Sequence, residues 1–270
     1  MRTRVLAGLV SGFIALFLNP LLALGDAPQK IQDNSFLIEE AYNQERGVVQ
    51  HIQTYQYLHK AKTWLYTFTQ EWPVPGQTHQ LSYTIPVDHL NDGGSTGIGD
   101  VALNYRYQLI MKEHLAVAPR FSVLLPTGDY KKGLGNGAVG YQTNLPVSVE
   151  LSDSWVTHWN AGATFTPGAE GASGIHADTR GYNLGASIIW LTSENFNILT
   201  EALWSSVESV NLDGTKTGQS SFFINPGVRF AINKPSGLQI VPGFSFPIGI
   251  GSSYREYGMF LYLSFEHPLF

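Results

Sequence analysis

From residue 47 onward, apolar and polar residues alternate with a period of two. In GYNLGASIIW (residues 181–190), Asn, Gly and Ser fall between the apolar residues Tyr182, Leu184, Ala186, Ile188 and Trp190. SFFINPGVRFAI and GLQIVPGFSFPI repeat the pattern, and their polar positions are rich in Gly, Ser, Asn and Arg. This period predicts β-strands with one apolar and one polar face.

About twelve segments of this kind follow one another. They span residues 47–57, 63–71, 78–87, 98–110, 115–126, 139–151, 155–166, 181–192, 196–208, 219–232, 238–248 and 257–270. Each has the length that a tilted strand needs to cross a bilayer. The sequence therefore predicts an all-β protein, a transmembrane antiparallel up-and-down β-barrel of about twelve strands, over residues 47–270.

The predicted connections alternate in length. They are short at EWPVPG, MKEH, SDS, SEN and NKPSG, and longer in the loops at 87–97, 127–138 and 167–180 and in ESVNLDGTKTG. Outer-membrane barrels have tight periplasmic turns and long outer loops. A secreted β-sandwich is the alternative, and it fits less well because its strands are usually shorter. Prolines 119, 146, 226 and 242 fall inside predicted strands, so we expect bulges at some of them.

The first 25 residues have the pattern of a secretory signal peptide. Arg2 and Arg4 precede a long apolar run, and small residues, ending in Gly25, precede Asp26. We expect cleavage near Gly25; a retained membrane anchor is the alternative. Residues 26–46 then form an N-terminal periplasmic or plug-like segment, which either enters the barrel lumen or caps its rim.

Composition excludes several classes of protein. The chain has 16 Lys and Arg against 21 Asp and Glu, and removing Arg2 and Arg4 leaves 14 against 21. A nucleic-acid partner is not expected for so acidic a protein. The chain contains no cysteine, so disulfides do not hold this exported protein together. Beyond the leader, no apolar run reaches the length of a transmembrane helix.

The chain ends on Phe270 with no polar residue after it. In a barrel, this residue would lie at the periplasmic rim of the closing strand, at the interface with outer-membrane lipid. A terminal Phe also resembles the insertion signal that the bacterial barrel-insertion machinery reads. Phe270 does not share the parity of Met259, Leu261 and Leu263, which predicts a bulge or break near Pro268.

Four stretches carry a resemblance to a known family. FLIEEAYNQERGVVQHIQTY, GIGDVALNYRYQL, LLPTGDY and GYQTNLPVSVEL are similar to the outer-membrane proteins of the MetA-pathway phenol-degradation family, over essentially the whole mature chain. The resemblance implies a porin-like transporter associated with phenolic compounds. It implies no established catalytic or substrate-binding residues.

Strand alternation predicts which polar side chains face the lumen. The pore-lining and substrate-contact candidates are Asp100, Asn104, Arg106, Arg120, Asn144, Glu150, His158, Glu201 and Arg229. Charges on a lumen wall must be paired or hydrated. They either form an eyelet that selects solutes by size and charge, or tie the walls of a closed barrel together.

We do not expect an enzyme. Outer-membrane lipid hydrolases present a His, a Ser and an Asn on the outer wall, and a Ser must lie within reach of its base. His158 and Asn160 share a face without an in-strand Ser partner, and that face points into the lumen. The Asn, Asp and Gly dipeptides of the loops are explained by turns, so no metal and no cofactor is expected.

These features predict an outer-membrane, porin-like channel for passive transport of small organic solutes, with aromatic or hydrophobic ones favoured by the resemblance alone. The alternative is a closed, non-conducting barrel with a structural or surface-interaction role.

Overall fold

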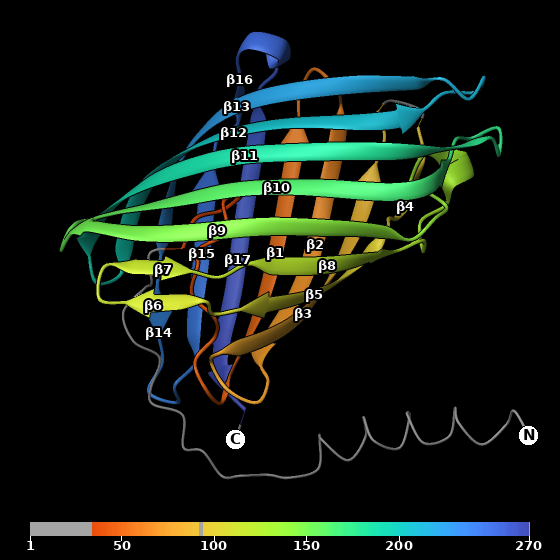
Figure 1. Cartoon of the computed structure of the whole chain (residues 1–270). Coiled ribbons are helices and arrows are strands. Elements are labelled where there is room, and N and C mark those ends of the chain that lie inside the picture. Colours follow the sequence, from red (N-terminus) through yellow and green to blue (C-terminus); the bar gives the residue numbers. More distant parts are fainter. Residues whose placement is uncertain (1–33, 92–93, 270) are drawn as a thin grey trace, which may run out of the picture.

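The computed structural model describes residues 34–91 and 94–269. The predicted signal peptide and the terminal Phe270 lie outside the described residues. The described chain forms a closed antiparallel β-barrel of twelve spans, as predicted (Figure 1). Within residues 34–91 and 94–269, helical structure is confined to two short 3₁₀ turns, η1 (Tyr130–Lys132) and η2 (Gly251–Ser253). No helix in this part of the chain is long and apolar enough to cross a membrane.

Some spans are single strands and others are broken into pieces. The single strands are β1 (Val48–Leu58), β2 (Thr63–Pro73), β3 (His79–His89), β9 (Gly140–Ser152), β10 (Trp155–Glu170), β11 (His176–Ser193), β12 (Phe196–Val210) and β17 (Gly258–Pro268). The broken spans consist of β4 (Thr96–Ile98), β5 (Val101–Tyr107) and β6 (Ile110–Lys112); β7 (Leu115–Val117) and β8 (Arg120–Leu125); β13 (Lys216–Phe230) and β14 (Ile232–Asn233); and β15 (Gln239–Ser245) and β16 (Ile248–Gly249).

The barrel closes between its first and last strands. β1 pairs with β2 on one side and with β17 on the other, in an unbroken antiparallel register from Val48 opposite Pro268 to Leu58 opposite Gly258. Closure gives each of the twelve spans two neighbouring spans, so the sheet has no free edge strand. The break expected near Pro268 does not interrupt this pairing.

The two ends of the barrel differ. At the short-turn end, strands are joined by connections such as residues 153–154 and 194–195. At the other, long-loop end, residues 126–139 form the longest described connection. The loop predicted at 167–180 is wrong for most of its length, because β10 and β11 continue as a hairpin and leave only residues 171–175 as the turn.

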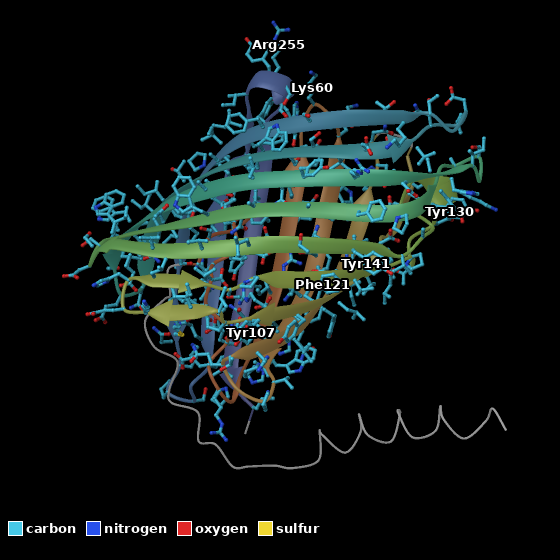
Figure 2. The ribbon with its side chains drawn as sticks, viewed as in Figure 1. Lys60, Tyr107, Phe121, Tyr130, Tyr141 and Arg255 are labelled. Atoms are coloured by element: carbon cyan, nitrogen blue, oxygen red, sulfur yellow. The ribbon has the colours of Figure 1, made fainter. Side chains whose placement is uncertain are left out.

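The alternation along the strands places most apolar side chains outside the barrel and most polar ones inside, as expected. Large apolar residues point outward and are exposed, and Figure 2 shows Phe121 and Tyr141 outside β8 and β9, where their rings stack at 6.3 Å. The inward positions are polar and are largely buried. The outer face is therefore mostly apolar, and the interior is filled largely by polar side chains.

The strand prolines behave less uniformly than expected. Pro119 lies in the gap between β7 and β8, where the neighbouring span is also interrupted between β5 and β6. Pro146, Pro226 and Pro242 lie within continuous strands. One register shift between β10 and β11 instead falls between Thr166 and Ala169, next to Pro167.

Candidate functional site: a chain segment bound inside the barrel

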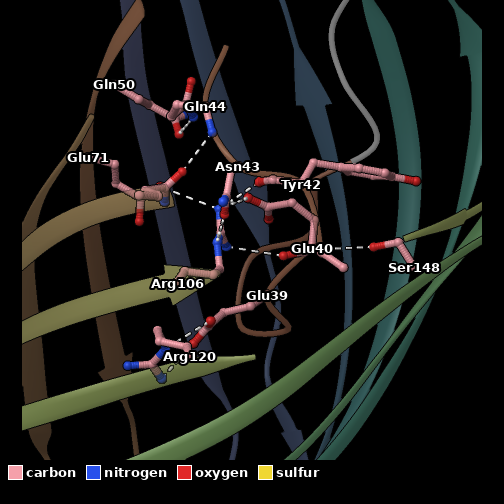
Figure 3. Close-up of polar contacts among 12 residues, drawn as sticks. Glu39, Glu40, Tyr42, Asn43, Gln44, Gln50, Glu71, Arg106, Arg120 and Ser148 are labelled. Carbon is pink, nitrogen blue, oxygen red and sulfur yellow. Dashed lines mark hydrogen bonds and ion pairs between the residues drawn. The ribbon is translucent and has the colours of Figure 1, made fainter. Parts of the chain in front are cut away.

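The residues before β1 lie inside the barrel. This luminal segment (residues 34–46) follows the inner wall and contacts β13, β12, β11, β10, β9, β8, β5, β3 and β1. Figure 3 shows it as an irregular chain surrounded by strands, with Arg106 and Arg120 directed towards it. It has no regular secondary structure of its own, so its peptide groups need partners from the wall.

The wall supplies acceptors for its N–H groups. Glu201 Oε1 accepts from the backbone N–H groups of Phe36, Leu37 and Ile38 at 2.9, 2.7 and 3.0 Å. The other carboxylate oxygen of Glu201 accepts from Asn225 Nδ2 at 2.6 Å. Glu201 is fully buried. A carboxylate that receives four donors is stabilised as an acceptor, so it fixes the first turn of the segment in place.

Further along, the same pattern continues with uncharged acceptors. Asn160 Oδ1, Ser148 Oγ, Gln108 Oε1 and Gln80 Oε1 accept from the backbone N–H groups of Glu39, Ala41, Asn43 and Gln44, at 2.7–2.9 Å. Because each acceptor projects from a different strand or from its end, the segment is held along its whole described length.

Arg106 donates hydrogen bonds to carbonyl groups of the segment. Its guanidinium donates to Glu40 O at 3.1 Å, to Tyr42 O at 2.6 Å and to Asn43 Oδ1 at 2.9 Å. Its Nη2 atom also lies 4.0 Å from carboxylate oxygens of Glu40 and Glu71. The side chain is almost entirely buried, so these contacts replace the water that the charge gives up.

Two other arginines bind the segment at separate points. Arg120 forms an ion pair with Glu39, with a nitrogen–oxygen distance of 2.7 Å, and also donates to Asn104 and Gln142. Arg229 donates to Asn34 O, and its guanidinium carbon lies 4.9 Å from the centre of the Tyr262 ring.

Glycines on the inner face make room for the apolar side chains of the segment. A Cβ atom at Gly185 would lie 2.1 Å from Ile38 Cδ1, and one at Gly243 would lie 2.4 Å from Phe36 Cε1. The Phe36 ring packs against Phe260 at 5.5 Å between centroids. The inward glycines therefore form sockets, since any larger residue would occupy the space of these side chains.

A layer of glutamines crosses the lumen near the short-turn end. Gln44 Nε2 donates to Gln50 Oε1 at 2.5 Å, and Gln50 Nε2 donates to Glu266 at 2.6 Å. Gln80, which receives the N–H of Gln44, donates to Glu71 at 2.8 Å. This glutamine layer links β17, β1, β2 and β3 through Gln44.

The structure brings together seven of the nine candidate lumen residues, all on the inner wall: Asn104, Arg106, Arg120, Asn144, His158, Glu201 and Arg229. The other two lie elsewhere. Asp100 accepts from the N–H groups of Gly128 and Asn136 and so holds the loop at residues 126–139. Glu150 is 42% exposed at the short-turn end, 3.2 Å from His114 Nδ1.

The search for a serine partner within one strand missed a contact between strands. Ser148 Oγ on β9 lies 2.7 Å from His158 Nδ1 on β10. Both side chains are fully buried, and Ser148 also accepts the N–H of Ala41. The pair thus holds the segment and offers no space for a substrate. In the described residues, no group of three or more His, Asp or Glu side chains could hold a metal ion.

Several cavities lie beside the segment, and two of them extend between the segment and the inner wall. One of about 350 Å³ opens over Glu39, Arg120 and Asn160, between the segment and β8–β12. The other, of about 410 Å³, lies between the segment and β1–β5 and runs from Gln56 to Glu71 and Arg106. Its wall carries the hydroxyl groups of Thr54, Thr67, Thr69, Ser82 and Thr84. We call this second space the threonine cavity.

Comparisons with known proteins give a class of fold. The chain resembles the crystal structure of an outer membrane channel from Pseudomonas putida F1, with a TM-score of 0.61 and 12% identity over 84% of this chain and 97% of that one. It also resembles the NanC porin, with a TM-score of 0.53 and 8% identity over 81% of this chain and all of that one. No family model matches the chain, and no curated protein matches its sequence. The fold is that of the outer-membrane channels and porins.

Proposed function

We propose that the protein is a bacterial outer-membrane channel for passive uptake of small organic solutes, and that its solutes pass through the threonine cavity. The observation that carries this proposal is the cavity itself, which runs along β1–β5 beside the luminal segment. The likeness to an outer membrane channel and to a porin supports the same assignment.

The side on which the cavity lies follows from the contacts of the segment. On β9–β12 the segment donates hydrogen bonds directly to four wall side chains: Ser148, Asn160, Ser187 and Glu201. On β1 and β2 the inward threonines instead bond to each other, as Thr54 does with Thr67 at 2.6 Å. A solute in the threonine cavity would therefore contact hydroxyl groups of β1 and β2 that do not bind the segment. The polar groups named on β9–β12 already bind it.

The chemistry of the cavity favours a small amphipathic solute. Hydroxyl and amide groups line it together with Ile52, Leu65 and the rings of Phe260 and Tyr262. Pockets of this mixed kind orient a compact organic molecule by a few polar contacts and bury its apolar part. A phenolic compound has this character, and the resemblance to the phenol-degradation family agrees with it.

The glutamine layer would be the last barrier on this route. Gln44 is the single member of the layer that belongs to the luminal segment. Because its bonds are uncharged and exchangeable for bonds to water, we assign it the role of a gate for the solute.

One observation favours the second candidate, a closed barrel with a structural or surface-interaction role. The segment satisfies its backbone through many buried wall side chains, including Glu201 and Arg106. Such a network is costly to open, because each separated donor or acceptor would lose its partner.

The two candidates are separated by solute flux. Protein in liposomes is tested by swelling in small organic solutes and by conductance in planar bilayers, with folding checked by heat-dependent gel mobility. Thr67→Trp should block the threonine cavity and reduce flux about tenfold. The matched control is Thr200→Trp, which places the same ring on the outer face of β12, where Thr200 lines an apolar surface groove. No flux through folded wild-type protein would reject the channel and leave the closed barrel.

A further inference from the structure

We infer that the outer face of β17, β1 and β2 is the contact surface through which two copies of this chain associate inside the membrane. The surface, here called the glutamine face, consists of His51, Gln53, Gln70 and His267. This inference rests on the proposed position of the barrel in a bilayer, but it does not depend on transport.

Both glutamines face away from the lumen. Inward positions on β1 and β2 are those that line the threonine cavity, such as Thr54 and Thr69, so alternation directs Gln53 and Gln70 outward. Gln53 lies opposite Phe68 and Leu263, at the middle of β1, β2 and β17. Its carboxamide is thus near the centre of the span, where the lipid offers no hydrogen bonds.

Each carboxamide has one partner. Tyr66 Oη donates to Gln53 Oε1 at 3.1 Å, and Tyr83 Oη donates to Gln70 Oε1 at 2.8 Å. Within residues 34–91 and 94–269, neither Nε2 group makes a hydrogen bond. Turning an amide over would only exchange its bonded and unbonded ends. The unbonded end of Gln53 is therefore unsatisfied near the centre of the span, where that is costly. The unbonded end of Gln70, opposite His51, lies on the same face towards the short-turn end.

The neighbouring histidines supply an acceptor. His267 Nδ1 lies 2.8 Å from Pro268 O, so this nitrogen carries the proton. His267 Nε2 must then accept, and it lies 3.2 Å from His51 Nε2, which donates. With both rings uncharged, this arrangement leaves His51 Nδ1 as a hydrogen-bond acceptor. Donors on two glutamines and an acceptor on a histidine thus share one surface.

This combination is complementary to itself. A carboxamide pairs with a second carboxamide, and a glutamine donor pairs with an imidazole acceptor, so a twofold axis through the face would match each unsatisfied group with one from the other copy. The surrounding rings are held by stacking, as in His51 on Phe68 with centroids 6.2 Å apart. Ordered aromatic side chains are well suited to an interface because little entropy is lost on contact.

The opposite wall lacks these features. On β9–β12, the outward positions of the spanning region carry Ala, Val, Leu, Ile, aromatic residues and threonines. Thr157, the most buried of these threonines, donates to Ser187 O at 2.7 Å and is satisfied within the chain. The outward side chains of that wall are apolar or, like Thr157, hydrogen-bonded within the chain, so we expect a second copy to bind at the glutamine face.

Cysteine cross-linking tests the geometry directly, because the chain contains no cysteine. In liposomes, Phe68→Cys on the glutamine face should form a disulfide-linked dimer on mild oxidation. Ala186→Cys, in the outward middle of β11, is the control and should remain monomeric. Flotation of the barrel with the liposomes checks the membrane location separately, so a failure of the proposed location is distinguished from a failure to dimerise.

A second variant tests the chemistry. Gln53→Leu with Gln70→Leu should raise the dimer dissociation constant in detergent about tenfold or more, as measured by light scattering. Thr157→Val with Thr200→Val on the opposite wall should leave it unchanged. A folded, membrane-inserted wild type that is monomeric and does not cross-link overturns the inference. So does a native-membrane complex whose mass requires a different protein on this face.

Discussion

The wall of β9–β12 and the wall of β1–β3 differ in the polar side chains that they carry on their inner and outer faces. Inside, the first wall binds the luminal segment through buried groups such as Glu201 and Asn160. The second binds it at Gln44 and otherwise faces the threonine cavity. Outside, the first is apolar and the second carries Gln53 and Gln70. Both walls have the same alternation, so the difference lies in which polar residues fill the alternate positions.

An inward polar residue in a barrel therefore need not line a path for solutes. Arg106 and Glu201 bind peptide groups of the same chain, and their charges are used in that contact. The threonines of β1 and β2 make few such contacts, and they are the wall groups best placed to meet a solute.

The largest effect is expected from Glu201→Ala. It removes the acceptor of three backbone N–H groups and of Asn225, which should cost about 3–5 kcal/mol of stability. A Leu37→Cys reporter should then react with maleimide much faster than in the parent protein. Glu113→Ala, at an exposed turn, is the control. An unchanged labelling rate would show that Glu201 does not hold the segment.

A smaller loss is expected from filling a socket. Gly243→Ala places a Cβ 2.4 Å from the Phe36 ring and 3.2 Å from Arg229 Cγ, so the ring must move, at about 1–3 kcal/mol. The measurement is the denaturant midpoint of the purified barrel. Gly218→Ala, where a Cβ meets nothing within 4 Å, should have no such cost. Equal midpoints for both variants would contradict a tight fit at Gly243.

On the cavity wall, Thr54→Val with Thr67→Val should cost less than about 1 kcal/mol in total, because it removes both members of one hydrogen bond together. Labelling of the Leu37→Cys reporter should stay at the parent rate. A large rise in labelling would mean that the β1–β2 wall also holds the segment, and the division between the walls would fail.

The smallest effect is expected beyond the wall, in the β12–β13 turn. Hydrogen bonds from Thr215 to Asp213 lower the pKa of this carboxyl group below its ordinary value of 3.8. The bond therefore stabilises the turn above that value and is lost as pH falls through the lowered pKa. The protection factor of the Thr215 amide, which is its exchange rate relative to an unstructured peptide at the same pH, should fall in acid while that of Gly185 is unchanged. An equal fall in protection at both sites would point to opening of the whole barrel.

Much of this architecture could be predicted from the sequence. The period of two located the twelve spans because lipid outside and polar groups inside impose opposite demands on successive residues. The prediction of a loop at 167–180 was wrong for most of its length because the Thr, Ala and Gly residues there resemble a turn, whereas cross-strand pairing keeps most of them in β10 and β11.

The candidate site was only partly predictable. Parity placed Asn104 and Arg229 on the inner wall, but it also proposed Asp100 and Glu150, which lie beyond the part of the wall that touches the segment. Ser148 was missed beside His158 because the two meet across strands. The glycines that form the sockets are visible in the sequence as inward positions of GYNLGAS and VPGF. Their role could not be predicted, because it depends on the packing of Ile38 and Phe36 against them in the folded barrel.

The sequence by itself determined the barrel, its strand number and the direction in which each side chain faces, because these depend on local period and chain length. The tertiary structure decided what the inward side chains do. Strand register brings Glu201, Arg106 and Gln80 round one irregular segment, and hydrogen bonds between residues more than a hundred positions apart leave no periodic trace in the chain. Which groups the inward side chains bind therefore depends on the closed barrel and cannot be inferred from any single strand.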